Sequence, residues 1–247
     1  MKTFRTMLKN EMKLSLRDMN MVIFAICIPL VVLILLGAIY GNKPASPGAE
    51  YTFLEQSFGA LTTISICAGG VMGLPLVVSD YRNKKILKRF KVTPVSPGMI
   101  LAVQVAIYTI YSVASLILLY IVSAVFWGFR MEGSIVAFLG SYLLVMLSIF
   151  SIGMMVGGIS PNSQTAGVIA SLLYFPMLIF SGATLPYEVM PEAMQKVVSI
   201  LPLTQGIKLL KAASLGLPIE RTFVPVIVMV VLAVICIGVS LCFFKWE

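Results

Sequence analysis

The sequence predicts an all-α polytopic membrane protein with six transmembrane helices, organised as a single domain over residues 1–247. Of the 247 residues, 59% are hydrophobic and only 11% are charged, which is typical of a membrane protein and not of a water-soluble one. The second observation is a set of five windows without Asp, Glu, Lys or Arg: 19–42, 56–79, 92–129, 133–187 and 222–244. A helix needs about 20 apolar residues to cross a bilayer, so each window accommodates at least one crossing.

The fourth window is long enough for two spans. A run of Ser, Pro, Asn and Ser at positions 160–163 divides it, and these residues together interrupt helices. The predicted spans are therefore about 21–41, 57–79, 99–127, 135–159, 166–185 and 223–244.

Residues 1–20 predict an amphipathic helix that lies on the membrane surface. Its basic residues recur every four positions and share one side of the helix: Arg5, Lys9, Lys13 and Arg17. Such a side suits lipid headgroups, while the opposite side is apolar. Glu11 and Asp18 interrupt the apolar side. We expect them to form a solvated rim, with contact to a partner as the alternative.

The basic segment, Asp80–Pro97, lies between two charge-free windows and holds six of the eighteen Lys and Arg residues. Basic loops between spans favour the cytoplasmic side. If both termini are also cytoplasmic, twelve Lys and Arg residues lie inside and six outside. The sequence therefore predicts a multi-pass protein of the cell (plasma) membrane with both termini in the cytoplasm. The basic segment is either a passive topology signal or a docking surface for a cytoplasmic partner.

The segment 186–221, between the last two spans, is too apolar for an ordinary loop. Pro191 and Pro202 suit helix starts, which predicts two short helices near 192–200 and 203–215. Each is too short to cross a bilayer, so we expect an external re-entrant or interfacial segment. A short external cap is the alternative.

The sequence offers little for catalysis. It has no histidine, no phosphate-binding loop of the form G-x-x-x-x-G-K-[ST] and no G-x-G-x-x-G. The four cysteines show no C-x-x-C spacing, so we predict no metal site. The net charge of +8 sits beside the spans, which favours lipid headgroups over nucleic acid. We predict that the chain is not an enzyme, and the absence of charged residues within the spans disfavours an ion-driven carrier.

Three stretches resemble the ABC type-2 permeases, the membrane subunits of ATP-binding-cassette exporters. DYRNKKILKRFKVTPVSPGMILAVQV is similar to the region after that family's second span, with Asp80 where the family usually has Glu. GGISPNSQTAGVIASLLYFPMLIFSGATLP is similar to its fifth span, including Pro176 and the closing Ser181-Gly182. MPEAMQKVVSILPLTQGIKLLKAASLG resembles its external re-entrant segment, with Lys211 where Arg is frequent. The resemblance covers nearly the whole chain.

The resemblance implies a permease subunit that exports an amphiphilic substrate, such as a drug, an antibiotic, a lipid or a hydrophobic peptide. A separate cytoplasmic ABC ATPase would bind ATP and Mg, and this chain would bind no cofactor of its own. A second permease chain is implied as well, in a homodimer or a heterodimer. The alternatives are a self-contained channel or secondary carrier without an ATPase partner, and an intramembrane enzyme.

The resemblance also implies roles for individual residues. A coupling helix between spans 2 and 3 would dock the ATPase through Asp80, Arg82, Lys85, Leu87, Arg89, Phe90 and Pro94. The external re-entrant motif would comprise Ser181, Gly182, Pro186, Pro202, Leu203, Thr204 and Lys211. Candidate path-lining residues are Thr62, Thr63, Ser65, Ser171 and Tyr174. For each of these hydroxyls, helix–helix packing is the alternative role.

Overall fold

The computed structural model describes residues 2–17, 19–41, 43–45, 51–84, 96–181, 191–218 and 220–243. Within these ranges the regular structure is helical, apart from an isolated bridge between Pro44 and Thr52. Six helical stretches are long and apolar enough to cross a membrane: Ile23–Tyr40, Phe53–Asn83, Gly98–Trp127, Ile135–Ile159, Ser163–Phe180 and Phe223–Cys242. The prediction of an all-α protein with six membrane-spanning helices is confirmed.

Two of the six spans contain a π-helical segment. The first is built from α2 (Met19–Val22), η1 (Ile23–Cys27) and α3 (Ile28–Tyr40), and the second from α4 (Phe53–Cys67), η2 (Ala68–Gly73) and α5 (Leu74–Asn83). The other four are α7 (Pro97–Trp127), α8 (Ile135–Ile159), α9 (Ser163–Phe180) and α12 (Glu220–Phe243). Among the described residues, three further helices flank the spans, namely α1 (Lys2–Arg17), α10 (Glu192–Val198) and α11 (Pro202–Ser214).

Caps set the starts of two spans a few residues earlier than the charge-free windows predict. The second span starts at Phe53, because Thr52 and Glu55 form a capping box in which Thr52 N donates to Glu55 Oε2 at 2.7 Å. The fifth span starts at Ser163, because Asn162 Oδ1 accepts a hydrogen bond from Thr165 N at 2.8 Å. The polar break in the fourth window is therefore a helix start.

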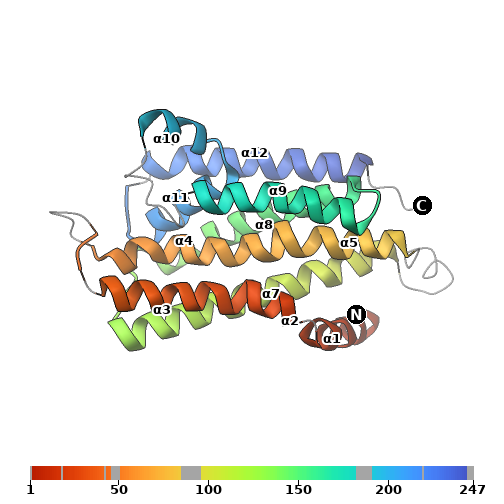
Figure 1. The fold of residues 1–247 in the computed structure, drawn as a ribbon, viewed down its shortest axis with the longest axis horizontal. Helices are drawn as coiled ribbons and strands as arrows, with labels where there is room; N and C mark the ends of the chain where they lie inside the picture. Colours follow the sequence, from red (N-terminus) through yellow and green to blue (C-terminus); the bar gives the residue numbers. More distant parts are fainter. Residues whose placement is uncertain are drawn as a thin grey trace.

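The spans run back and forth along one bundle, so the connections gather at its two ends (Figure 1). At one end, called here the α1 end, lie α1, the end of α5, the turn from α8 to α9 and the end of α12. At the opposite end, the α10 end, lie α10 and the connection from α3 to α4. Because the number of spans is even, α1 and the last residues of α12 lie at the same end of the bundle.

The second span is the centre of the bundle. In it, 83% of the most apolar window is buried inside the chain, compared with 22% in the first, fifth and sixth spans. Glycines permit this close packing. A Cβ on Gly153 of α8 would lie 1.9 Å from the carbonyl oxygen of Gly70 in η2, so the two backbones are in direct contact. A Cβ on Gly59 would meet the backbone of Lys211 in α11 at 2.7 Å.

The two π-helical segments lie against each other in the first and second spans. The i→i+5 pattern of a π-segment interrupts the regular ladder of backbone hydrogen bonds. Ser65 Oγ donates a hydrogen bond to the carbonyl oxygen of Ala25 in η1 at 2.6 Å. The hydroxyl thus ties the second span to the first at the point where the ladder of the first is irregular.

The two short helices predicted near 192–200 and 203–215 correspond to α10 and α11. The longer one, α11, is largely buried and packs against α4, α8 and α12. Gln205 Nε2 of α11 donates a hydrogen bond to the carbonyl oxygen of Ser199, in the turn between α10 and α11. That this segment is re-entrant in a bilayer stays a prediction.

Replacing Gly153 with Ala tests the backbone contact at the bundle centre. The new methyl group would overlap the Gly70 carbonyl, so we expect the free energy of unfolding to fall by at least about 2 kcal/mol. The measurement is thermal unfolding in a mild detergent. Gly140→Ala is the matched control, because nothing lies within 4 Å of its Cβ position and the change should be neutral or stabilising by up to about 1 kcal/mol. Equal stability of the two variants would contradict the packing argument.

Candidate functional site

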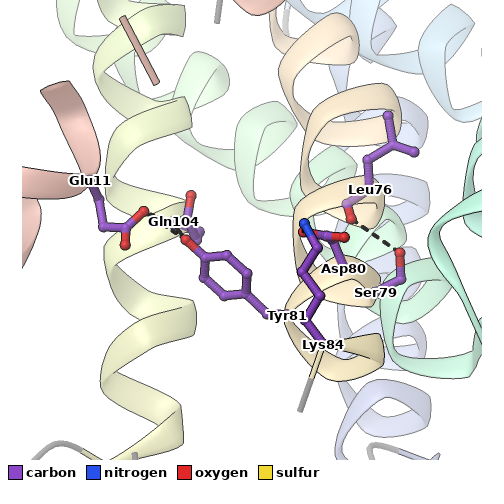
Figure 2. Close-up of polar contacts among 7 residues, drawn as sticks. All are labelled: Glu11, Leu76, Ser79, Asp80, Tyr81, Lys84 and Gln104. Atoms are coloured by element: carbon purple, nitrogen blue, oxygen red, sulfur yellow. Dashed lines mark hydrogen bonds and ion pairs between the residues drawn. The ribbon is translucent and has the colours of Figure 1, made fainter. Parts of the chain in front are cut away.

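Three helices meet in a polar contact at the α1 end of the bundle (Figure 2). The Tyr81 hydroxyl of α5 donates to Glu11 Oε2 of α1 at 2.6 Å. Gln104 of α7 donates from Nε2 to the same carboxylate oxygen at 3.1 Å and to the Tyr81 hydroxyl at 3.0 Å. We call these three residues the Glu11 triad. Its members are half-buried except for Gln104, which is only 4% exposed.

The position of Glu11 corrects the expectation of a solvated rim. Glu11 turns toward the protein because α1 packs on α7, and residues four apart on α1 then face α7 together. Ser15 lies one turn beyond Glu11, and its Oγ accepts a hydrogen bond from the Tyr111 hydroxyl of α7 at 2.8 Å. The other acid of that predicted rim, Asp18, lies outside the described residues.

Sequence reasoning also missed Tyr81 and Gln104. The signal was present for Gln104, which is a glutamine within the charge-free window 92–129. A polar side chain inside a membrane-spanning helix needs a hydrogen-bonding partner, so its position indicated an inward contact. Nothing in the spacing of the residues identified Glu11, about ninety residues earlier in the chain, as that partner.

The start of the basic segment, at the end of α5, lies next to this triad. α5 ends at Asn83, one residue before Lys84, whose ammonium lies 2.8 Å from the Asp80 carboxylate. That ion pair is on the surface, with the two side chains 64% and 31% exposed, so its contribution to stability is small. Asp80 and Tyr81 are neighbours in the sequence, and the second of them reaches toward α7 (Figure 2).

Arg82 joins the start of the basic segment to a different helix. Its guanidinium donates to the carbonyl oxygens of Gly158 and Ser160, at the end of α8. The last carbonyls of a helix lack partners within that helix and carry partial negative charge, which a cation stabilises. The end of α8 is thus bonded to a side chain of α5, and the start of the basic segment is attached to three further helices, α1, α7 and α8.

Among the residues predicted to dock an ATPase, Asp80 and Arg82 belong to α5. The others lie outside the described residues: Lys85, Leu87, Arg89, Phe90 and Pro94. Their docking role stays a prediction, as does that of Asp80 and Arg82.

A cavity of about 370 Å³ adjoins the triad. Glu11, Tyr81 and Gln104 line it, together with apolar side chains of α1 and α5 such as Leu14 and Leu76. Side chains from four helices and from the start of α9, at Ser163, contribute to its wall. The cavity separates part of α1 from α5, and the Tyr81 side chain reaches toward α1 along its wall.

The predicted external motif lies at the α10 end. Ser181, which caps α9, is buried, as are Leu203 and Thr204 in the first turn of α11, where Pro202 is the first residue. Lys211 lies with its ammonium 5.8 Å from the ring centroid of Tyr51. Gly182 and Pro186 lie outside the described residues. The motif and the Glu11 triad therefore occupy opposite ends of the bundle.

The candidate path-lining residues of the second span face the interior of this chain. Thr62 and Thr63 donate to carbonyl oxygens one turn earlier on α4, and Ser65 donates to Ala25. All three are at most 1% exposed. On α9, Tyr174 is buried and Ser171 is half-buried. Contact of any of them with a transported molecule stays a prediction.

Over the parts of the chain that the structure describes, no three His, Cys, Asp or Glu side chains come close enough to hold a metal ion.

The sequence matches the profile of a family described as ABC-2 type transporter over residues 2–215. It is 27% identical to the inner membrane transport permease YhhJ of Escherichia coli over 171 residues, which is 68% of this chain and 44% of that protein. It is 35% identical to nodulation protein J of Rhizobium leguminosarum over 75 residues, which is 30% of this chain and 29% of that protein.

A third relative is the putative transport permease YvfS of Bacillus subtilis, with 22% identity over 194 residues, 78% of this chain and 77% of that protein. The chain thus spans less than half the length of the first two relatives and about three quarters of the third.

Substitution of Arg82 tests its bonds to the end of α8. Arg82→Ala removes two charge-assisted hydrogen bonds to carbonyls, so we expect the free energy of unfolding to fall by about 1.5–3 kcal/mol. Thermal unfolding in a mild detergent measures it. Lys84→Ala, which removes only the surface ion pair with Asp80, is the control and should cost less than about 1 kcal/mol. A larger loss in the control than in Arg82→Ala would contradict this assignment.

Proposed function

The chain belongs to the ABC-2 type transporter family, and we propose that it is the permease subunit of an exporter driven by a separate cytoplasmic ATPase. Members of this family are membrane transport components that work with ATP-binding subunits. The observation that carries the proposal for this chain is the place of the basic segment. Its described start, at the end of α5, lies at the α1 end, and the segment holds a third of all Lys and Arg residues.

The proposed docking surface is the coupling helix within the basic segment. Lys85, Leu87, Arg89 and Phe90 would enter a groove of the ATPase, with the apolar side chains buried and the basic ones at the rim. Arg82 and Tyr81, which lie in α5 at the start of the segment, support this role. Because they bond to α8, α1 and α7, a force on the segment would be transmitted to several helices at once.

The proposed transport path lies between two permease chains. The first and fifth spans support this arrangement, because only 22% of each is buried within the chain and their outer faces are free for lipid or for a second chain. The second span is mostly enclosed by its own chain, so it would contribute few side chains to such a path. Apolar walls without charged residues favour an amphiphilic substrate, such as a drug, an antibiotic, a lipid or a hydrophobic peptide.

Two substitutions on the predicted apolar side of the coupling helix test ATPase docking. Leu87→Asp with Phe90→Asp would place two carboxylates in an apolar groove, so we expect loss of ATPase binding with normal membrane insertion. The measurement is the stoichiometry of the ATPase that copurifies with the tagged chain in a mild detergent. Val197→Asp with Ile200→Asp is the matched control, because both residues are exposed near the α10 end. Unchanged ATPase binding by the Leu87/Phe90 variant would remove the docking assignment.

Single cysteines test which end faces the cytoplasm. Lys9→Cys in α1 and Lys196→Cys in α10 are introduced at exposed positions of a chain whose four native cysteines are replaced by Ala. The proposed orientation places α1 inside. A membrane-impermeant maleimide should therefore label position 196 on intact cells and position 9 only after permeabilisation. The reverse pattern would overturn the orientation.

A further inference from the structure

The Glu11 triad is a closed ring of three hydrogen bonds. The Tyr81 hydroxyl donates once, to Glu11, and accepts once, from Gln104. Gln104 Nε2 lies 3.1 Å from Glu11 Oε2 and 3.0 Å from the Tyr81 hydroxyl, and it donates to both. Hydrogen bonds to a carboxylate are stronger than those between neutral groups. The triad therefore joins α1, α5 and α7 through three mutually bonded side chains.

We propose that Glu11 is a positioning residue that makes α1 move together with the start of the ATPase-docking segment, an inference that rests on the proposed function. Tyr81 is the connecting side chain. It lies one residue after Asp80 and three before Lys84, so any displacement of the docking segment acts first on the helical turn that carries Tyr81.

The cavity beside the triad is the second observation. It holds about 370 Å³ between α1 and the ends of α5 and α7, and Glu11, Tyr81 and Gln104 all contribute to its wall. α1 packs on α7, but α1 and α5 face each other across this cavity and lack the dense packing that would otherwise fix their relative position. The side-chain link across it therefore decides how closely α1 follows α5, while the free space allows α1 to shift without overlap.

The side of α1 that faces away from the triad carries its basic residues. Arg5, Lys9, Lys13 and Arg17 are exposed, on the side of α1 that suits headgroups. A helix held by headgroups on one side and by Tyr81 on the other would fix the last turn of α5 relative to the membrane surface. When the ATPase moves that segment, α1 is carried with it as long as the triad is intact.

The chain offers a matched control for the triad. The Tyr111 hydroxyl donates to Ser15 Oγ at 2.8 Å and so joins α1 to α7 one turn from Glu11. Tyr111→Phe removes the same chemical group as Tyr81→Phe, and it also releases one hydrogen bond of α1. Only Tyr81→Phe breaks the link between α1 and α5. A loss of stability common to both variants therefore identifies structural effects that do not depend on the triad.

The experiment measures the distance between spin labels at Lys9→Cys and Asn83→Cys, both exposed, in the full chain without native cysteines. Pulsed electron paramagnetic resonance is recorded in nanodiscs, for the chain alone and for its complex with the copurified ATPase, with and without ATP. We expect one narrow distance that ATP leaves unchanged with the triad intact. Glu11→Ala and Tyr81→Phe should broaden or shift it, Glu11→Gln should have a smaller effect, and Tyr111→Phe should have none.

ATP turnover by the same complexes supplies the functional measurement. Energetic coupling through such a network predicts a loss of about two- to thirtyfold for Glu11→Ala and for Tyr81→Phe, with unchanged ATPase stoichiometry. Because both changes break the same link between α1 and α5, the double variant should be no worse than either single variant. Turnover and label distances equal to those of Tyr111→Phe would overturn the inference. A wild-type chain that copurifies with no ATPase would overturn the proposed function instead, and the label distance in the chain alone would still test the link between α1 and α5.

Discussion

Direct backbone contact at glycines holds the second span at the centre of the bundle, and the arrangement of the other helices depends on it. Helices in lipid gain no hydrophobic stabilisation from packing on one another, so close approach and good van der Waals contact must hold them together. Gly153 on α8 and Gly70 in η2 meet with no side chain between them, and Gly59 brings α4 into close contact with the backbone of α11. These contacts leave the first, fifth and sixth spans at the periphery, with their outer faces uncovered.

The central span also connects the two ends of the molecule. Its α10 end is enclosed by α11, and its α1 end carries Tyr81 and Arg82, which attach it to α1, α7 and α8. The π-helical segment η2 lies between these two ends. π-segments are frequent at functional positions in helices, because they change the direction of the side chains that follow them. A displacement that starts at the basic segment thus enters the helix that contacts most of the bundle.

Polar side chains inside the spans have two kinds of partners in this chain. Thr62, Thr63 and Ser65 satisfy their hydroxyls with backbone carbonyls, which is the packing role common in membrane helices. Gln104 instead bonds to side chains of two other helices. In the sequence, these hydroxyl residues and Gln104 look alike, because each is a polar residue within an apolar window. Their difference depends on which helix faces the residue, a property that periodicity within one helix does not contain.

The sequence by itself determined the number of spans, the amphipathic α1, the basic segment between spans two and three, and the two short helices α10 and α11. These features depend on local hydrophobicity, charge and helix-breaking residues, which act within about twenty positions. Only the tertiary structure decided that Glu11 faces inward, that Arg82 completes the end of α8 and that Gly153 meets Gly70. Each of these contacts joins residues at least seventy positions apart, so it exists only once the helices have packed.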